Sequence, residues 1–223
     1  MKKIVYLFIF QLMIFGCKNQ EKNFDVSDEK QTILQKIAQA NGIENWKEVK
    51  KISYTFNVDR DSSHYERSWV WWPQENKVKM IGKSDTVVYE RSQMDSLAQK
   101  TDRAFINDKY WLLFPFNLVW DTGFSHQTKK NVPAPISKNP MTEVVVSYNN
   151  TTGYTPGDTY KIYVDDEFII REWSYVPSGK KEPAMSTTWE DYVEKNGIKI
   201  AKMHQSETGD FKIYFTGISV ETP

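Results

Sequence analysis

Apolar and polar side chains alternate without interruption in the stretch Ile52-Ser53-Tyr54-Thr55-Phe56-Asn57-Val58-Asp59. Successive side chains of a β-strand point to opposite faces of the sheet, so a period of two indicates a strand with one buried and one wet face. The buried face is expected to consist of Ile52, Tyr54, Phe56 and Val58.

Further strand-like segments, each bounded by turn residues, lie along the rest of the chain. Short turns such as Asp165-Asp166-Glu167 and Glu194-Lys195-Asn196-Gly197 join neighbouring segments, and the second contains the Asn-Gly pair typical of hairpins. Strands joined by hairpins run in opposite directions, so we expect an antiparallel sheet. The expected strands are residues 68–72, 77–81, 86–89, 143–148, 159–164, 168–175, 186–193, 198–205 and 211–219.

Two helices are expected among these strands. The first has Ser27 as a suitable N-cap and Asn41-Gly42 as a stop signal. A second, more polar helix is expected within residues 93–107. One face of the first helix would carry Ile33, Leu34, Ile37 and Ala38.

The segment from Tyr110 to Trp120, with the sequence YWLLFPFNLVW, is the most apolar part of the chain after the N-terminal region. Pro115 interrupts it, and this predicts a bend instead of one long helix or a membrane span. A sheet with one apolar face needs a cover, so we expect this segment to lie across that face. The residues that follow, 121–140, contain three prolines and are expected to form a loop.

The N-terminus has the pattern of an export signal. Lys2 and Lys3 precede an apolar stretch over residues 4–15, which is too short to span a bilayer. The ending Ile14-Phe15-Gly16-Cys17 resembles the lipobox of bacterial lipoproteins. This resemblance implies that residues 1–16 are a signal peptide, that cleavage occurs before Cys17, and that the thiol of this residue carries lipid.

The domain organisation follows from this cleavage. Residues 17–26 are polar and form a lipidated tether, and residues 27–223 form a single domain. Cleavage removes two lysines and no acidic residue, which leaves 27 basic and 29 acidic side chains. A balance this even gives no electrostatic footprint for nucleic acid. Cys17 is the one cysteine, so the domain has to be stable through its core without a disulfide.

The order of elements resembles that of the periplasmic lipoprotein carriers and their outer-membrane receptors. The hairpin from Tyr163 to Arg171 and the later one from Thr188 to Ile200 carry this resemblance. The segment from Tyr110 to Phe116 is similar to one in uncharacterised lipoproteins of Bacteroidetes-type bacteria. The resemblance implies a mainly β fold, in which a curved antiparallel sheet forms an incomplete barrel, a few helices cover its concave face, and an apolar cavity lies between them.

Sequence motifs for catalysis are not found. His64, His126 and His204 are far apart and belong to no metal-binding pair, so each is expected at the surface or in a loop. The acidic run at residues 165–167 is expected to be a solvated turn, and no G-x-S-x-G elbow occurs. We therefore expect no catalytic residues, no metal, no cofactor and no enzymatic activity.

Two functions agree with these features. The first is binding of an acyl chain or lipid in the cavity. The second is a non-enzymatic interaction or structural lipoprotein with a filled core, in which exposed rings such as Trp69 or Trp71 meet a protein partner. An open cavity facing residues 110–120 would favour the first function, for which the expected ligand contacts are Trp111, Leu112, Phe114 and Phe116.

The expected location is the cell envelope. Lys18 follows the lipidated cysteine in place of the aspartate that retains some lipoproteins at the inner membrane. By resemblance, this indicates a lipid-anchored protein at the outer membrane that faces the periplasm.

Replacement of the anchoring cysteine tests this interpretation. Several acyl chains give stable attachment, because each buried methylene contributes about 0.8 kcal/mol. Cys17→Ser should therefore release the protein from membranes or leave its signal peptide uncut, as read from membrane fractionation and mass. A variant that still sediments with membranes at the mature mass would place the anchor elsewhere.

Overall fold

The computed structural model describes residues 31–149 and 156–223, and all of them belong to one compact unit, Gln31–Pro223. The signal peptide, Cys17 and the tether at 17–26 lie outside the described residues. These parts therefore stay predictions.

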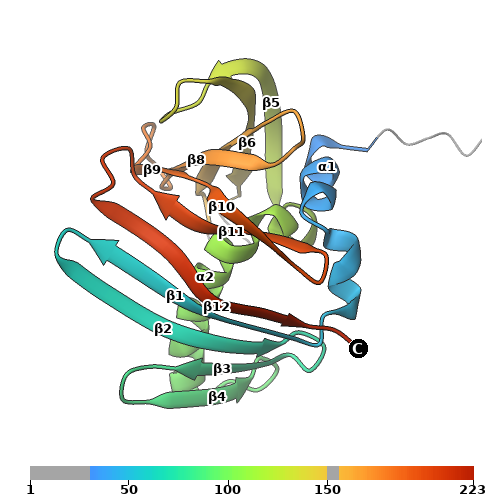
Figure 1. Ribbon diagram of the computed structural model, residues 1–223, viewed down its shortest axis with the longest axis vertical. Helices are drawn as coiled ribbons and strands as arrows, with labels where there is room; N and C mark the ends of the chain where they lie inside the picture. Colours follow the sequence, from blue (N-terminus) through green and yellow to red (C-terminus); the bar gives the residue numbers. More distant parts are fainter. Residues whose placement is uncertain (1–30, 150–155) are drawn as a thin grey trace, which may run out of the picture. The chain divides into compact units, whose positions relative to one another are not determined.

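The described chain forms two antiparallel sheets (Figure 1). One sheet has seven strands in the order β10-β11-β12-β1-β2-β3-β4, and the other has five in the order β5-β6-β7-β8-β9. The strands are β1 Lys51–Arg60, β2 Ser63–Trp72, β3 Lys77–Ile81, β4 Thr86–Glu90, β5 Phe124–Pro133, β6 Pro140–Tyr148, β7 Thr159–Val164, β8 Ile170–Val176, β9 Met185–Thr188, β10 Glu190–Lys195, β11 Ile198–Gln205 and β12 Phe211–Glu221.

The predicted mainly β, antiparallel fold with few helices is confirmed, and the described part is not closed into a barrel. The chain passes from the five-stranded sheet to the seven-stranded sheet at Trp189. Residues 186–193 were expected to form one strand, but β9 ends before this residue and β10 begins after it, and the two strands belong to different sheets. The Trp189 side chain is buried, and its backbone N–H donates to the Arg171 carbonyl at 2.6 Å.

The prediction of a loop at residues 121–140 is wrong. This stretch contains β5, which pairs with β6 in a register that places Pro133 opposite Pro140. A proline cannot donate to a ladder hydrogen bond and is tolerated at strand ends and on edge strands. β5 is an edge strand, and Pro133 is its last residue, so the proline signal did not exclude a strand here.

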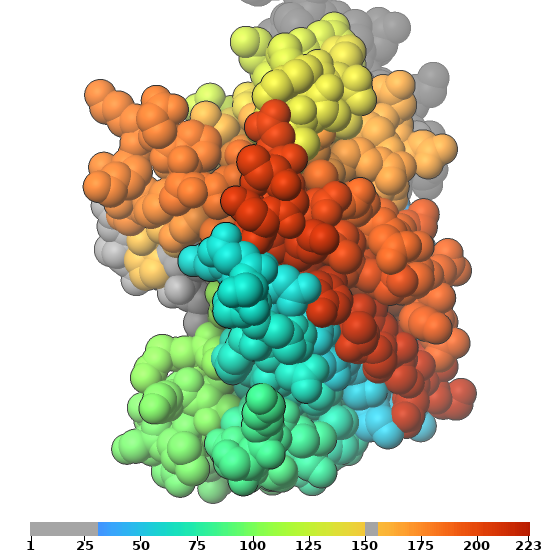
Figure 2. Space-filling view, turned by 60° about the vertical axis from the view of Figure 1, so that its left-hand side comes forward, coloured from blue at the N-terminus to red at the C-terminus, as the bar shows by residue number. Residues whose placement is uncertain are grey.

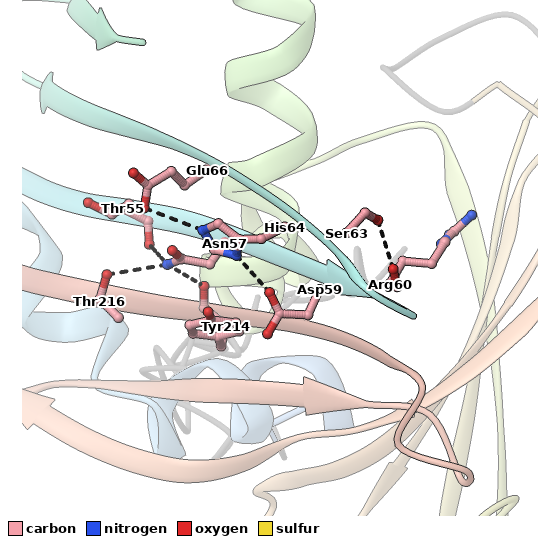
Figure 3. Close-up of polar contacts among 9 residues, drawn as sticks. All are labelled: Thr55, Asn57, Asp59, Arg60, Ser63, His64, Glu66, Tyr214 and Thr216. Atoms are coloured by element: carbon pink, nitrogen blue, oxygen red, sulfur yellow. Dashed lines mark hydrogen bonds and ion pairs between the residues drawn. The ribbon is translucent and has the colours of Figure 1, made fainter. Parts of the chain in front are cut away.

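The alternation in β1 is confirmed for Ile52, Tyr54 and Phe56, which are buried, while Val58 is half-buried. Asn57 is an exception, because it was expected to be solvated and is only 3% exposed. The β1–β12 register shifts between Ser53 and Thr55, where β12 bulges. The Asn57 amide nitrogen satisfies the displaced backbone there, as Figure 3 shows: it lies 3.1 Å from the Thr55 carbonyl, 3.2 Å from the Tyr214 carbonyl and 3.2 Å from the Thr216 hydroxyl.

The first helix, α1, spans Ile33–Ala40. Its N-cap is Thr32, not Ser27, and Thr32 and Gln35 form a reciprocal capping box. The predicted stop is confirmed, because Asn41 is the C-cap. The predicted apolar face is also confirmed, with Leu34, Ile37 and Ala38 buried and Ile33 half-buried against the core.

A short 3-10 helix, η1 (Ile43–Glu48), follows and lies close to the β10–β11 turn. That turn has positive φ at Asn196 (48°) and Gly197 (75°), the geometry that the Asn-Gly pair predicted. Asn45 donates from its amide nitrogen to the Gly197 carbonyl at 3.1 Å. A Cβ on Gly42 would lie 1.8 Å from the same carbonyl oxygen, so only glycine allows this close approach.

The long helix α2 spans Ser96–Trp120, with Asp95 as its N-cap. It is kinked at Leu113, whose φ of −128° and ψ of 25° are not helical. Pro115 lacks an N–H and its ring clashes with the preceding turn, which explains a kink just ahead of it. The predicted bend is therefore confirmed, and α2 consists of two helical parts on either side of the kink.

α2 packs against both sheets (Figure 1). In the half before the kink, the Phe105 ring lies 5.4 Å from the rings of Trp69 and of Trp71 in β2. After the kink, the Phe114 ring lies 5.2 Å from the rings of Tyr160 in β7 and of Trp173 in β8. One helix thus supplies core side chains to both sheets. Within the described residues, no helix combines the length and the apolar character needed to cross a membrane.

A buried ion pair fixes α2 to β2. The fully buried Asp108 carboxylate accepts hydrogen bonds from Arg67 Nε at 2.6 Å, Arg67 Nη2 at 2.5 Å and Trp69 Nε1 at 2.7 Å. Burial raises the pKa of Asp108, and the Arg67 guanidinium opposes this rise. Three donors on one carboxylate fix both the position and the rotation of the helix.

Loss of this carboxylate should destabilise the whole unit. Asp108→Ala leaves the half-buried Arg67 guanidinium without its counter-charge, and breaking a buried pair costs about 3–5 kcal/mol. Urea unfolding should show this loss, while Asp166→Ala, at an exposed turn position, should stay within about 0.5 kcal/mol of the parent. Equal effects of the two changes would contradict the structural role of Asp108.

Candidate functional site

A cavity of about 600 Å³ lies between the two sheets and α2. This volume is in the range of small-molecule binding sites. Figure 2 shows the face on which the tip of the β1–β2 hairpin (cyan), the start of β12 (red) and the β8–β9 segment (orange) meet. The lining residues are Phe56, Val58, Tyr65, Arg67, Arg103, Ile106, Asn107, Tyr110, Trp111, Asp158, Tyr160, Trp173, Tyr175, Met185, Phe211 and Ile213.

The apolar wall of the cavity continues the alternation that defines the strands. Phe56 and Val58 are two residues apart on β1, and Phe211 and Ile213 are two residues apart on β12. Each pair therefore faces the same side of the seven-stranded sheet. The same regularity that builds the core also gives the cavity its apolar lining.

α2 contributes one of its faces, which begins at an exposed arginine and ends at a buried tryptophan. The lining residues Arg103, Ile106, Asn107, Tyr110 and Trp111 are spaced by the turns of a helix. Arg103 and Asn107 are exposed, whereas Ile106, Tyr110 and Trp111 are buried. At 1.5 Å per residue, the positions of Arg103 and Trp111 are roughly 12 Å apart along the helix axis.

The inner wall is made of stacked aromatic rings. The Trp111 ring meets the Trp173 ring edge-on at 4.5 Å, and the Tyr160 ring stacks on Trp173 at 5.2 Å. Tyr110 and Tyr148 share the Asp121 carboxylate, at 2.5 Å and 2.7 Å from their hydroxyls. Burial is the main cause that raises the pKa of both tyrosines, so both stay protonated donors at neutral pH. The wall is therefore pre-formed.

The four side chains expected to contact a ligand occupy two different environments. Trp111, 7% exposed, lines the cavity. Leu112, Phe114 and Phe116 are 1%, 0% and 1% exposed, lie in the hydrophobic core, and are not among the lining residues. Strand residues such as Tyr160 and Trp173, and the two arginines of the lining, were not expected from sequence, because contacts between distant strands leave no local pattern.

The rings proposed to meet a protein partner are buried. Trp69 is fully buried and donates to Asp108, and Trp71 packs against Phe105 and Trp46. The exposed position that the interaction-protein alternative requires of these two indoles is therefore contradicted. Trp69 and Trp71 are two residues apart on β2, so both side chains point to the face of the sheet that α2 covers.

The expected surface position of His204 is wrong. This residue is fully buried in β11, with ring centroids of Trp189 at 4.4 Å and Trp111 at 5.3 Å. Neither ring nitrogen has a hydrogen-bond partner among the described residues. Burial lowers the pKa of His204 to about 3, and the Thr188 backbone opposes this only weakly. The sequence contained a pattern that indicates burial: His204 is an even number of residues from the buried Ile198 and Ile200 in β11, so its side chain points to the same face.

The surface prediction is confirmed for His64 and His126, which are both exposed. His64 Nδ1 lies 2.7 Å from an Asp59 carboxylate oxygen, and Nε2 lies 3.5 Å from Glu66 (Figure 3). The hydrogen bond to Asp59 is the main cause that raises the pKa of His64. Asp59 of β1 and His64 of β2 lie opposite each other in the strand register, and neither residue lines the cavity.

Two further polar groups, the turn at residues 165–167 and Lys109 of α2, lie outside the cavity lining. In the turn at 165–167, Asp165 accepts from the backbone N–H groups of Glu167 and Ile169 and pairs with Arg171, so this carboxylate shapes the turn. Lys109 is buried in α2, and burial lowers its pKa to about 8. Within residues 31–149 and 156–223, no cluster of three or more histidine, cysteine or acidic side chains is placed to hold a metal ion.

Comparison with known proteins finds no matching family model and no matching curated protein. Among solved structures, a LolA superfamily protein from Nitrosomonas europaea aligns over 86% of this chain and 96% of its own, with 9% identity and a TM-score of 0.47. An outer membrane lipoprotein-sorting protein domain from Vibrio parahaemolyticus aligns over 85% and 92%, with 10% identity and a TM-score of 0.47. A DUF1329 family protein from Desulfovibrio piger aligns over 85% and 92%, with 7% identity and a TM-score of 0.46.

Two of these neighbours are named for the class of proteins that the sequence resembles. The TM-scores are below 0.5, and no ligand or residue role is transferred from these proteins to this chain.

The buried histidine predicts sensitivity to acid. Its folded-state pKa of about 3 lies below the unfolded value of about 6.5, so the unfolded chain binds the proton more readily. Stability should fall as the pH drops from 6.5 towards 3, with a contribution of about 3–5 kcal/mol from this group. His204→Phe should flatten the pH dependence of urea unfolding in this window.

His126→Phe, at an exposed position, is the matched control and should keep the pH dependence of the parent. If the parent and His204→Phe lost stability equally between pH 6.5 and 4, the neutral buried imidazole would not be the cause.

Proposed function

We propose that this chain binds the acyl chain of a lipid-like ligand in the cavity between the two sheets and α2. The observation that carries this proposal is the cavity itself, about 600 Å³ in volume and walled largely by apolar and aromatic side chains. Moving a methylene group from water into such surroundings contributes about 0.8 kcal/mol, so a long chain gains affinity with each buried carbon.

The stiffness of the wall supports this function. Trp111 is held by Trp173, and behind it Phe114 packs on the same indole. Arg67 of β2 also lines the cavity. Its guanidinium is bound to Asp108 of α2, and this ion pair holds the helix in place. A ligand that enters a pre-formed site does not have to order these side chains, and this reduces the cost of binding.

Of the four side chains expected from sequence, we propose Trp111 as a direct ligand contact. Leu112, Phe114 and Phe116 would support its position from the core. The binding function is non-enzymatic. The one carboxylate that the described residues contribute to the lining, Asp158, already accepts hydrogen bonds from the Tyr175 hydroxyl and the Ser178 N–H.

The proposed setting is the cell envelope, with lipid on Cys17 and the domain facing the periplasm from the outer membrane. The segment between Cys17 and Gln31 contains 14 residue steps. Fully extended, it would span at most about 50 Å. A tether of this length would keep the cavity close to a membrane surface that supplies or receives the ligand.

A substitution that fills the cavity tests the proposal with little effect on the core. Val58 is half-buried and lines the cavity, so Val58→Phe places a ring in the space for the ligand. Binding of a fluorescent fatty acid should weaken at least about tenfold, and the melting temperature should stay near that of the parent. Val88→Phe, at an exposed position on β4, is the control and should bind normally.

Trp111→Ala gives a complementary result, because Trp111 is both a wall residue and nearly buried. It should weaken fatty-acid binding and also cost about 3–5 kcal/mol of stability, as large core truncations do. If the parent protein binds no fatty acid, the acyl-chain proposal is wrong. The remaining function would then be a non-enzymatic interaction or structural lipoprotein.

A further inference from the structure

An unpaired cation lies at the outer end of the cavity. Arg103 lines the cavity, is exposed, and has no hydrogen-bond or ion-pair partner among the described residues. The other charged groups of the lining are engaged. Arg67 is neutralised by Asp108, and Asp158 accepts from Tyr175 and Ser178. Arg103 is therefore the cation of the lining that is available to a ligand.

Arg103 stands in a definite relation to the apolar wall. It lies about two turns before Trp111 on α2, and both line the cavity together with the buried Ile106 and Tyr110 and the exposed Asn107 between them. The helix therefore presents a charge at one end of this face and aromatic rings roughly 12 Å further along its axis. An amphiphile laid along this face would place its polar group and its apolar chain in matching surroundings.

We infer that the cavity selects amphiphiles with an anionic headgroup, which pairs with Arg103 while the single apolar chain extends towards Trp111. This inference rests on the proposed function and adds the chemical class and orientation of the ligand. A guanidinium presents a planar fork of donors that matches both carboxylate and phosphate oxygens.

The test is competition against a bound fluorescent fatty acid with three ligands of the same chain: oleate, oleoyl lysophosphatidate and uncharged methyl oleate. The parent should bind at least one of the two anions about tenfold more tightly than the ester. A preference for oleate would identify a carboxylate headgroup, and a preference for the lysolipid would identify a phosphate. Equal binding of all three would overturn the inference.

Arg103→Gln should remove the preference by weakening the anions about tenfold while leaving the ester unchanged. Arg103→Lys should restore part of the preference. The matched control is Lys100→Gln, which removes an exposed charge on the same helix outside this cavity and should keep the preference. Equal weakening of all three ligands by Arg103→Gln, or the same loss with Lys100→Gln, would overturn the role of Arg103.

Failure of the underlying function gives a different result. If neither the anions nor the ester bind the parent protein, the acyl-chain site itself is refuted. If the ester binds as well as the anions, the acyl-chain site stands and only the headgroup inference is refuted.

Discussion

The structure depends on a single helix that serves two sheets. Before its kink, α2 packs Phe105 against the tryptophans of β2, and after the kink it packs Phe114 against Tyr160 and Trp173. The non-helical Leu113, ahead of Pro115, lets one helix follow two surfaces of different orientation. The cavity lies where this helix and the two sheets leave a volume that their own side chains do not fill.

The core next to the inner wall of this cavity contains buried polar atoms that have no hydrogen-bond partner among the described residues. Trp173 Nε1, Trp189 Nε1, Thr187 Oγ1 and both nitrogens of His204 are buried without hydrogen-bond partners among the described residues. Each such atom costs about 1–3 kcal/mol. Local departures from full polar satisfaction are expected near functional sites. The five atoms named here lie where β8, β9 and β11 meet, next to the Trp111–Trp173 contact, and four others lie elsewhere in the described core.

Local patterns in the sequence predicted the elements well and their assembly poorly. The alternation from Ile52 to Phe56 and the Asn196-Gly197 turn depend on nearby residues and were recognised directly. The division at Trp189 depends on which sheet each half joins, and the cavity depends on contacts between distant strands. Of the site, sequence reasoning found Trp111 through its apolar segment. It missed Arg103, because an exposed arginine on a polar helix is unremarkable until its neighbours are known.

The pairing of β1 with β12 has a consequence for how the chain reaches its folded form. The five-stranded sheet is built from one contiguous stretch of hairpins, but the seven-stranded sheet joins Lys51 to Glu221. Contacts so distant in sequence carry a large loop-closure entropy and slow the folding of a domain. β1 pairs with β2, which is close to it in sequence, whereas its other edge has no partner until β12 is in place. An unpaired edge of this kind is a template for aggregation, so the newly made chain is most vulnerable just before β12 is complete.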